Sequence, residues 1–326
     1  MSGMGRRGLL ATAPALLAAL RASEAAAQAW PVRPVAMVVG FAPGGSTDVV
    51  ARLLAERLGA EFEQPFVVDN RAGASGTVGQ AFVARARPDG HTLLVTPNST
   101  FTMARHFFPN RGYDDERDLA PVCMIASMPI FLCVSPRSGM KDLSELVRRA
   151  KAEPGRLNYA VSGAGTAFFS TELLLGAAGI EVQRVTYRGG AQAMQALIAN
   201  EVQMAFVDGV TAIPLMAAGQ LVALGVSTAS RSALAPDIPT IAEQGYPGFD
   251  VATDIALFAP AGTPADIIQR LHAATAKAMA TPEMQERLRQ ASVAADVTTP
   301  EELRAYTSRE GARWAEVIRS RSIKLE

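Results

Sequence analysis

The chain has 326 residues, 49% of them hydrophobic and 19% charged, which is long enough for two domains with separate hydrophobic cores. Lysine plus arginine and aspartate plus glutamate each number 31, so the charge balance gives no sign of a nucleic-acid partner or an anionic membrane surface. The three histidines are scattered and the two cysteines lack metal-ligand spacing, so neither a metal ion nor a cofactor is expected.

The first 29 residues predict an export signal. Arg6 and Arg7 precede an apolar run over 8–20, and residues 27–29 form a small-x-small cleavage pattern. The apolar run is too short to span a membrane. A periplasmic location follows, and the paired arginines leave open whether export uses the twin-arginine or the general route.

A glycine-rich turn follows the first predicted strand, residues 35–39. Gly40 to Gly45 form the turn, and Ser46 or Thr47 caps a helix through 49–58. The backbone N–H groups and helix dipole there attract an anion. The spacing approaches that of a P-loop but lacks its lysine, which favours a carboxylate over a triphosphate. A tight turn without a ligand is the alternative.

Strands and helices then alternate with short turns, which predicts an α/β fold with a mostly parallel sheet. The first helix is expected to end at Gly59, and Thr-Pro pairs at 263, 281 and 299 are expected to begin the last three helices. Ligands of such sheets bind beyond the carboxyl ends of the strands, where Asn98 and Ser99 follow a strand over 92–96.

Two consecutive apolar strands, 122–126 and 130–134, have no helix between them and mark the passage into a second domain. Cys123 and Cys133 lie in these strands. They could pair if the strands were antiparallel neighbours, although two buried thiols are the favoured interpretation.

The chain is therefore divided into two lobes joined by a hinge. Residues 30–131 with 252–326 form the first lobe, and 132–251 form the second. The C-terminal helices are expected to pack on the sheet of the first lobe.

A second strand, glycine loop and helix recur at 157–178, with Ser162, Gly163, Gly165 and Thr166 in the loop. Two such loops facing each other could hold one carboxylated solute from both sides. Three further candidates follow predicted strands. Arg188, beside Gly189, either neutralises an anion or is solvated, and Asp208 either caps the next helix or meets the ligand.

No serine or cysteine occupies a nucleophile elbow, and no histidine is placed to activate one, so the sequence does not support an enzyme. At this point the pattern resembles the Bug-type (TctC-like) extracytoplasmic solute receptors of tripartite tricarboxylate transporters. The resemblance covers essentially the whole mature chain. Its motifs are 41–48 (FAPGGSTD), 68–73 (VDNRAG), 88–90 (PDG), 158–160 (NYA), 162–166 (SGAGT), 187–189 (YRG) and 257–264 (LFAPAGTP).

The resemblance implies a type II-like periplasmic-binding-protein fold, each lobe a mixed sheet flanked by helices. It implies a monomer that closes on a small organic acid and delivers it to membrane transporter subunits. In that family the facing loops grip a carboxylate through backbone N–H groups, hydroxyls and water. The predicted ligand-binding set is Phe41, Gly44, Gly45, Ser46, Thr47, Asn98, Ser99, Ser162, Gly163, Gly165, Thr166, Phe169, Arg188, Gly189, Asp208 and Asp254.

The sequence departs from the family pattern at the far end of the pocket. Val207 takes the place of a usual aspartate, with Asp208 one residue later; Phe169 replaces a frequent histidine, Asp254 a usual tryptophan and Ala104 a frequent asparagine. We therefore expect a monocarboxylate with an apolar or aromatic body and a hydroxyl or amine facing Asp254. A di- or tricarboxylate such as citrate should fit poorly, because like charges repel.

Two other classes of function stay open from the sequence. The same closure would serve a sensory receptor that presents its ligand-bound form to a signalling partner. An enzyme on the same two-lobed fold would instead convert the bound acid.

Overall fold

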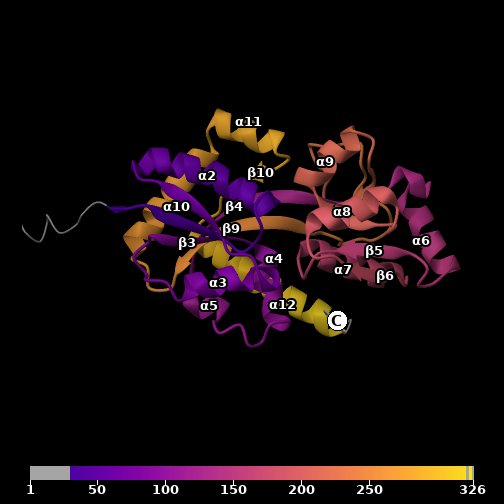
Figure 1. The fold of residues 1–326 in the computed structure, drawn as a ribbon, viewed down its shortest axis with the longest axis horizontal. Helices are drawn as coiled ribbons and strands as arrows, with labels where there is room; N and C mark the ends of the chain where they lie inside the picture. The colour runs from indigo at the N-terminus through magenta and orange to yellow at the C-terminus, as the bar shows by residue number, and fades with distance from the viewer. Residues whose placement is uncertain (1–29, 321–322, 325–326) are drawn as a thin grey trace, which may run out of the picture.

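The computed structural model describes residues 30–320, 323 and 324, and the predicted export signal lies outside them. The described chain forms two lobes side by side, with β4 and β9 running between them (Figure 1). Within this part of the chain, no helix is long and apolar enough to cross a bilayer.

The first lobe contains a mixed sheet, in the order β10-β4-β9-β3-β1-β2. β1 pairs in parallel with β2 and β3, whereas β9 runs antiparallel to both β3 and β4, so the sheet is less parallel than expected. Its strands are β1 (Val35–Val39), β2 (Phe66–Asn70), β3 (Thr92–Pro97), β4 (Leu119–Val134), β9 (Ala252–Pro260) and β10 (Ala294–Ala295).

Helices cover both faces of this sheet because alternate strand residues point to opposite sides. Met37 packs into a core with α2, α10 and α11, while its neighbour Val38 packs into another with α3, α4 and α12. These helices are α2 (Ser46–Phe62), α3 (Thr77–Ala84), α4 (Asn98–Met103), α10 (Ala265–Met279), α11 (Pro282–Gln290) and α12 (Pro300–Ser320).

The second lobe has β5 (Asn158–Val161) parallel to β6 (Gln183–Thr186), and β7 (Ala205–Asp208) and β8 (Val222–Val226) antiparallel to the end of β4. Its helices are α6 (Leu143–Ala152), α7 (Thr166–Ala178), α8 (Gly190–Ala199) and α9 (Gly209–Ala217). The remaining short turns of helix are η1 (Ala74–Gly76), η2 (Ala104–His106), α5 (Asp115–Asp118) and η3 (Pro136–Ser138).

The prediction of two separate strands over 122–134 was wrong, because β4 is one strand of 16 residues. Pairing with β9 continues as far as Pro129, which keeps the backbone extended between the two apolar runs. Cys123 and Cys133 therefore lie on one strand, about 33 Å apart at about 3.3 Å per residue, and cannot pair. Both thiols are free and buried, as favoured, and burial raises the pKa of Cys123 to about 12.

Two predicted helix boundaries were also wrong. α2 continues through Gly59 to Phe62, and its C-cap residue Glu63 adopts a left-handed φ of 54°. The Thr263 hydroxyl donates to the Pro260 carbonyl and leaves the start of α10 without a side-chain cap. The caps at Thr281 and Thr299 are confirmed.

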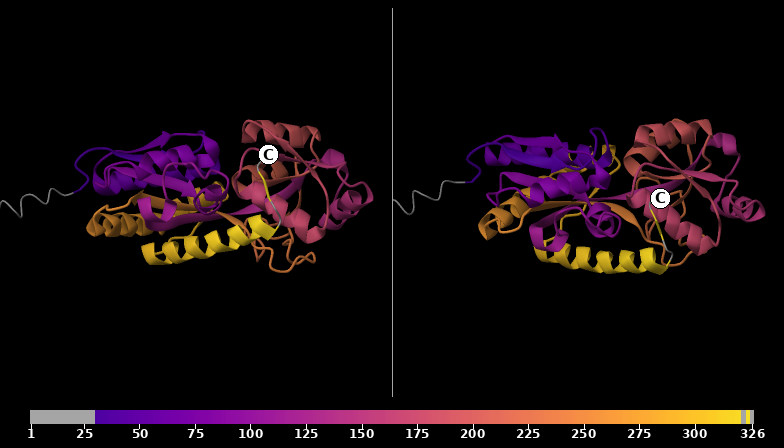
Figure 2. Two further views of the ribbon diagram at one scale, coloured as in Figure 1. Left: turned by 90° about the horizontal axis from the view of Figure 1, so that it is seen from below. Right: turned by 60° about the horizontal axis from the view of Figure 1, so that its bottom comes forward.

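α12 runs beneath the first lobe and reaches the second (Figure 2). Leu303, near its start, packs against the sheet of the first lobe, as expected for the C-terminal helices. Trp314, in its second half, instead packs in the second-lobe core, with its ring 5.5 Å from that of Phe169 on α7. The prediction that the C-terminal helices pack on the sheet of the first lobe is therefore wrong for Trp314 in this half of α12.

Replacing Trp314 with alanine should lower the free energy of unfolding by about 3–5 kcal/mol, the usual cost of a large aromatic cavity. Trp314 is 2% exposed and fills the space between α12 and α7. Urea unfolding measures the change. Arg319→Ala, at an exposed position on the same helix, is the control and should stay within about 0.5 kcal/mol of wild type. Equal stability of the two variants would contradict the packing described.

Candidate functional site

Helices that begin at the boundary between the lobes lack side-chain caps. Among the described residues, no side chain accepts a hydrogen bond from the first turn of α2, α7 or α8, whose cap positions are Gly45, Gly165 and Gly189. α3, α9 and α10 also lack a side-chain cap, whereas α5, α6 and α11 are capped by Asp114, Asp142 and Thr281. An uncapped first turn leaves N–H groups for water or an anionic ligand.

A buried carboxylate fixes the shape of the first glycine loop. Asp48 accepts hydrogen bonds from the Gly44 backbone N–H at 2.9 Å, from Arg52 and from Asn70. Asn70 also donates to the Phe41 carbonyl. Burial raises the pKa of Asp48, but these hydrogen bonds outweigh it and hold the pKa below its usual value. The Gly44 amide is thus engaged within the protein. Sequence reasoning missed this network, although Asp48 and Arg52 are spaced one helical turn apart.

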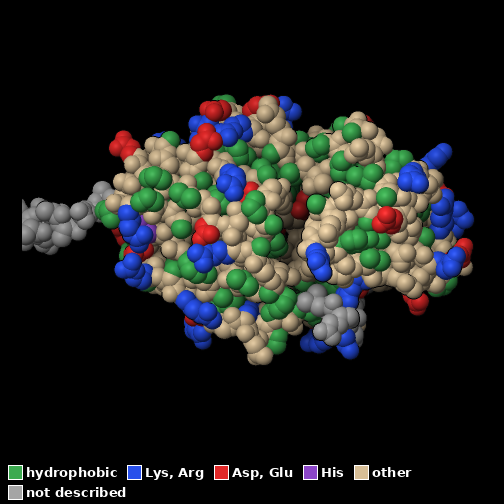
Figure 3. Space-filling model, in the orientation of Figure 1, with side chains coloured by type: hydrophobic (Ala, Val, Ile, Leu, Met, Phe, Trp, Pro, Cys, Tyr) green, Lys and Arg blue, Asp and Glu red, His purple; other side chains and the backbone are tan. Residues whose placement is uncertain are grey.

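The two lobes meet through hydrogen bonds between the predicted loops. The Ser46 hydroxyl donates to Asp208 Oδ2 at 3.0 Å, and the Thr253 hydroxyl donates to Asp208 Oδ1 at 2.8 Å. The Ala164 backbone N–H donates to the Ser75 hydroxyl at 3.1 Å. The first and second glycine loops therefore converge, and Figure 3 shows the surface hollowed between the lobes.

Asp208 does not cap α9, which was one of the two roles that the sequence left open. It occupies the cap position, but no hydrogen bond joins its carboxylate to the helix. Its two oxygens accept from Ser46 and Thr253 instead. Removal from water raises the pKa of Asp208, and the hydroxyls of Thr253 and Ser46 only partly offset that rise.

A second part of the boundary is a cavity of about 490 Å³ between α4, the start of α7 and α12. Four predicted residues line it, namely Asn98, Ser99, Thr166 and Asp254. Residues that sequence reasoning missed also line it, including Met103, Ser127, Tyr306, Arg309, Glu310, Arg313 and Trp314. Most of these come from α12, whose passage between lobes carried no sequence signal.

Polar groups in this cavity are buried and only partly satisfied. Asp254 accepts from the Ser127 hydroxyl at 2.6 Å and from the Tyr306 hydroxyl. Burial raises the pKa of Asp254 above its usual range. Asn98 is 5% exposed, and its Oδ1 atom is buried without a hydrogen-bond partner among the described residues. An acceptor in this state favours a ligand that donates a hydrogen bond.

The other predicted residues are placed less uniformly. Phe169 is fully buried and packs against Phe107, Phe168 and Trp314, so it lies in the core and away from the cavity.

The remaining predicted residues lie on or near the glycine loops. Thr47 is 5% exposed. Arg188 is exposed. Space is open above the Cα atoms of Gly44, Gly165 and Gly189, whereas Gly163 faces the Ser75 hydroxyl. Ser162, Gly45 and Phe41 lie in the loops described above.

The fold is shared with periplasmic solute-binding proteins. Solved structures of R. palustris Rpa4515 with adipate and of the periplasmic binding protein BugD match with TM-scores of 0.86 and 0.83. Their sequences are 33% and 30% identical, and each match covers 90% of this chain and 99% of the other.

The sequence comparisons give the family. The model described as "Tripartite tricarboxylate transporter family receptor" (TctC) matches residues 50–323. The UPF0065 protein in the tcbD-tcbE intergenic region of Pseudomonas sp. strain P51 is 38% identical over 325 residues, covering 98% of this chain and 95% of that protein. The chain belongs to the tripartite tricarboxylate transporter receptor family, and it is a periplasmic solute-binding receptor.

The position of Asp208 predicts that closure of the empty protein depends on pH. Closure desolvates Asp208 and raises its pKa, so the closed form binds the proton more tightly than an open form would. Protonation of Asp208 therefore stabilises the closed form at low pH. This stabilisation begins to be lost as the pH rises above about 4, the ordinary pKa of an aspartate, and is lost completely above the raised pKa of Asp208 in the closed form. Small-angle X-ray scattering at several pH values should show the radius of gyration increasing.

Asp208→Asn is the matched control, because the amide has nearly the same shape and no charge. Its radius of gyration should stay constant over the same range. An equal pH response in wild type and variant would contradict this role for Asp208.

Proposed function

We propose that this receptor closes on a small organic acid, holds a carboxylate of it between the two glycine loops, and passes it to the membrane subunits of a tripartite tricarboxylate-type transporter. The convergence of the loops carries the proposal, through the bonds of Ser46 to Asp208 and of Ala164 to Ser75. The related Rpa4515, whose structure contains adipate, supports a carboxylated solute.

The proposed carboxylate site combines backbone N–H groups and hydroxyls from both lobes. Its residues are Gly45, Ser46 and Thr47 from the first lobe, and Ser162, Gly163, Gly165 and Thr166 from the second. The start of an uncapped helix supplies the donors on each side. A hydrogen bond to a charged group contributes about 1.5–3 kcal/mol, so several suffice for micromolar affinity after the costs of ordering.

The other end of the solute is proposed to carry a hydroxyl or amine. Asp254 and the unpartnered Asn98 Oδ1 both present acceptors to the cavity that Thr166 also lines. A second carboxylate at Asp254 would be repelled. Met103 and Trp314 line this cavity, whereas the predicted Phe169 does not, and each is 2% exposed, so the apolar contact they give to the body of the solute is small.

The lobes are proposed to be residues 30–131 with 252–326, and 132–251. Most buried side chains support this division, since separate hydrophobic clusters form on either side of it. The buried exceptions, which belong to the first lobe by number but join second-lobe clusters, are Met103, Ile130, Phe131, Trp314 and Ile323. Residues 1–29 are proposed to direct export, by the general or the twin-arginine route.

The bound solute is proposed to be released unchanged, because a receptor needs only binding. Mass spectrometry of the solute after prolonged incubation with the protein checks this. A new product would favour an enzyme on the same fold.

Ser46→Asp should abolish binding of every carboxylate, lowering affinity by at least about a hundredfold. The new charge would stand where the solute carboxylate binds and would face Asp208 as well. Isothermal titration calorimetry measures the loss. Ser144→Asp, in the first turn of the exposed helix α6, is the control and should bind normally. Undiminished binding by a folded Ser46→Asp protein would refute the proposed clamp.

The wild-type protein should bind hydroxy-substituted aromatic monocarboxylates at least about tenfold more tightly than citrate. Asp254→Ala should reduce the difference between these two affinities. The substitution removes both the acceptor for the hydroxyl of the solute and the charge that repels citrate. A thermal-shift screen followed by calorimetry measures both, since a ligand of the closed form raises apparent stability. Tight binding of citrate by wild type would rule out the assigned solute class.

A further inference from the structure

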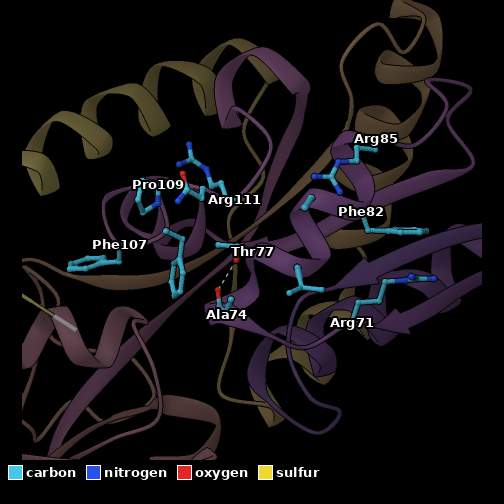
Figure 4. Close-up of a pocket in the computed structure, with 12 residues that line it drawn as sticks. Arg71, Ala74, Thr77, Phe82, Arg85, Phe107, Pro109 and Arg111 are labelled. Carbon is cyan, nitrogen blue, oxygen red and sulfur yellow. Dashed lines mark hydrogen bonds between the residues drawn. The ribbon is translucent and has the colours of Figure 1, made fainter. Parts of the chain in front are cut away.

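The surface of the first lobe has a groove of about 800 Å³ between α3 and the segment 107–111 (Figure 4). Arg71, Phe82 and Arg85 lie toward one end, and Phe107 lies at the other, with Ala74 and Thr77 between them. Neither Asp254 nor the second glycine loop lines the groove, so it is separate from the proposed solute site.

The groove exposes apolar surface. Val78 is 49% exposed and Phe82 is 40% exposed. They are two of only four large hydrophobic side chains that are exposed in the described part of the chain. Exposed apolar side chains gathered at one place commonly mark a contact with another molecule.

The charge of the groove is of one sign. Arg71, Arg85 and Arg111 line it, and none of the described lining residues is acidic. Arg111 is ion-paired at 2.7 Å with Asp115, which does not line the groove, so Arg85 is the lining arginine without a carboxylate partner among the described residues. The Arg71 guanidinium lies 3.5 Å from the centroid of the Phe82 ring, and its partner Asp69 lies outside the groove. Arg85 donates to a backbone carbonyl, at Gly112, and so keeps its charge uncompensated by that bond. The complementary occupant is acidic and carries an apolar side chain.

Both walls of the groove are tied to the second lobe. Ser75, next to Ala74 in one wall, accepts the Ala164 N–H from the second glycine loop. Phe107, in the other wall, has its ring 5.5 Å from that of Phe169 on α7. Opening of the lobes would break both contacts, so the shape of the groove depends on closure.

We propose that this groove is where an acidic, apolar-tipped periplasmic loop of the membrane transporter docks on the closed receptor. The inference rests on the proposed delivery of solute to such a transporter. Because its walls are held by second-lobe contacts, the groove distinguishes the closed receptor from the open one. The transporter would thereby select receptors that carry solute.

Phe82→Glu and Arg85→Glu test the docking site in two chemically different ways. Each should lower receptor-dependent solute uptake into cells by at least tenfold, while the dissociation constant of the purified receptor for the same solute changes less than twofold. Val32→Glu is the matched control, since Val32 is 51% exposed and does not line the groove. Its uptake should equal that of wild type.

Reversing the charge of the partner gives an independent measurement. Suppressors that restore uptake to Arg85→Glu should replace an acidic residue in a periplasmic loop of the membrane subunits with a basic one. Normal uptake by both groove variants would overturn the proposal. Weakened solute binding by folded variants would also overturn it, in favour of a second solute site. Absence of solute binding by wild type would instead refute the proposed function.

Discussion

The pairing of β4 with β9 is the constraint on which the rest of the molecule depends. β4 enters from the first sheet, pairs with β9 as far as Pro129, and then pairs with β7 and β8 in the second lobe. This pairing determines which way the side chains of neighbouring β9 residues point. Thr253 is hydrogen-bonded to Asp208, whereas Asp254 is hydrogen-bonded to Ser127 and Tyr306. Neighbouring residues of β9 thus contribute to both polar regions between the lobes, and Thr166 of the second glycine loop lines the cavity that contains Asp254.

Local signals in the sequence were sufficient for most of the fold. Apolar runs located β1 and β3, and the two glycine loops placed the starts of α2 and α7. The errors arose where tertiary contacts overrode local preference. Packing carries α2 through Gly59. Pairing with β9 holds Pro129 within β4, where the local sequence predicted a break between two strands.

The candidate site was predictable to the extent that it is made of helix starts and strand ends. Ser46, Thr166 and Asn98 follow from that rule. The contributions of Tyr306 and Trp314 did not, because they depend on α12 crossing from one lobe to the other. Phe169 was assigned to the ligand from its place after a glycine loop, but helical periodicity turns it into the core.

The continuity of β4 has a mechanical consequence for the receptor. A hinge made of a loop can rotate freely about a few bonds, whereas a hydrogen-bonded ladder resists and spreads the rotation as a small change of twist over several residues. The connection between the lobes is therefore stiffer than a hinge made of a loop. This stiffness limits how far one lobe can rotate against the other.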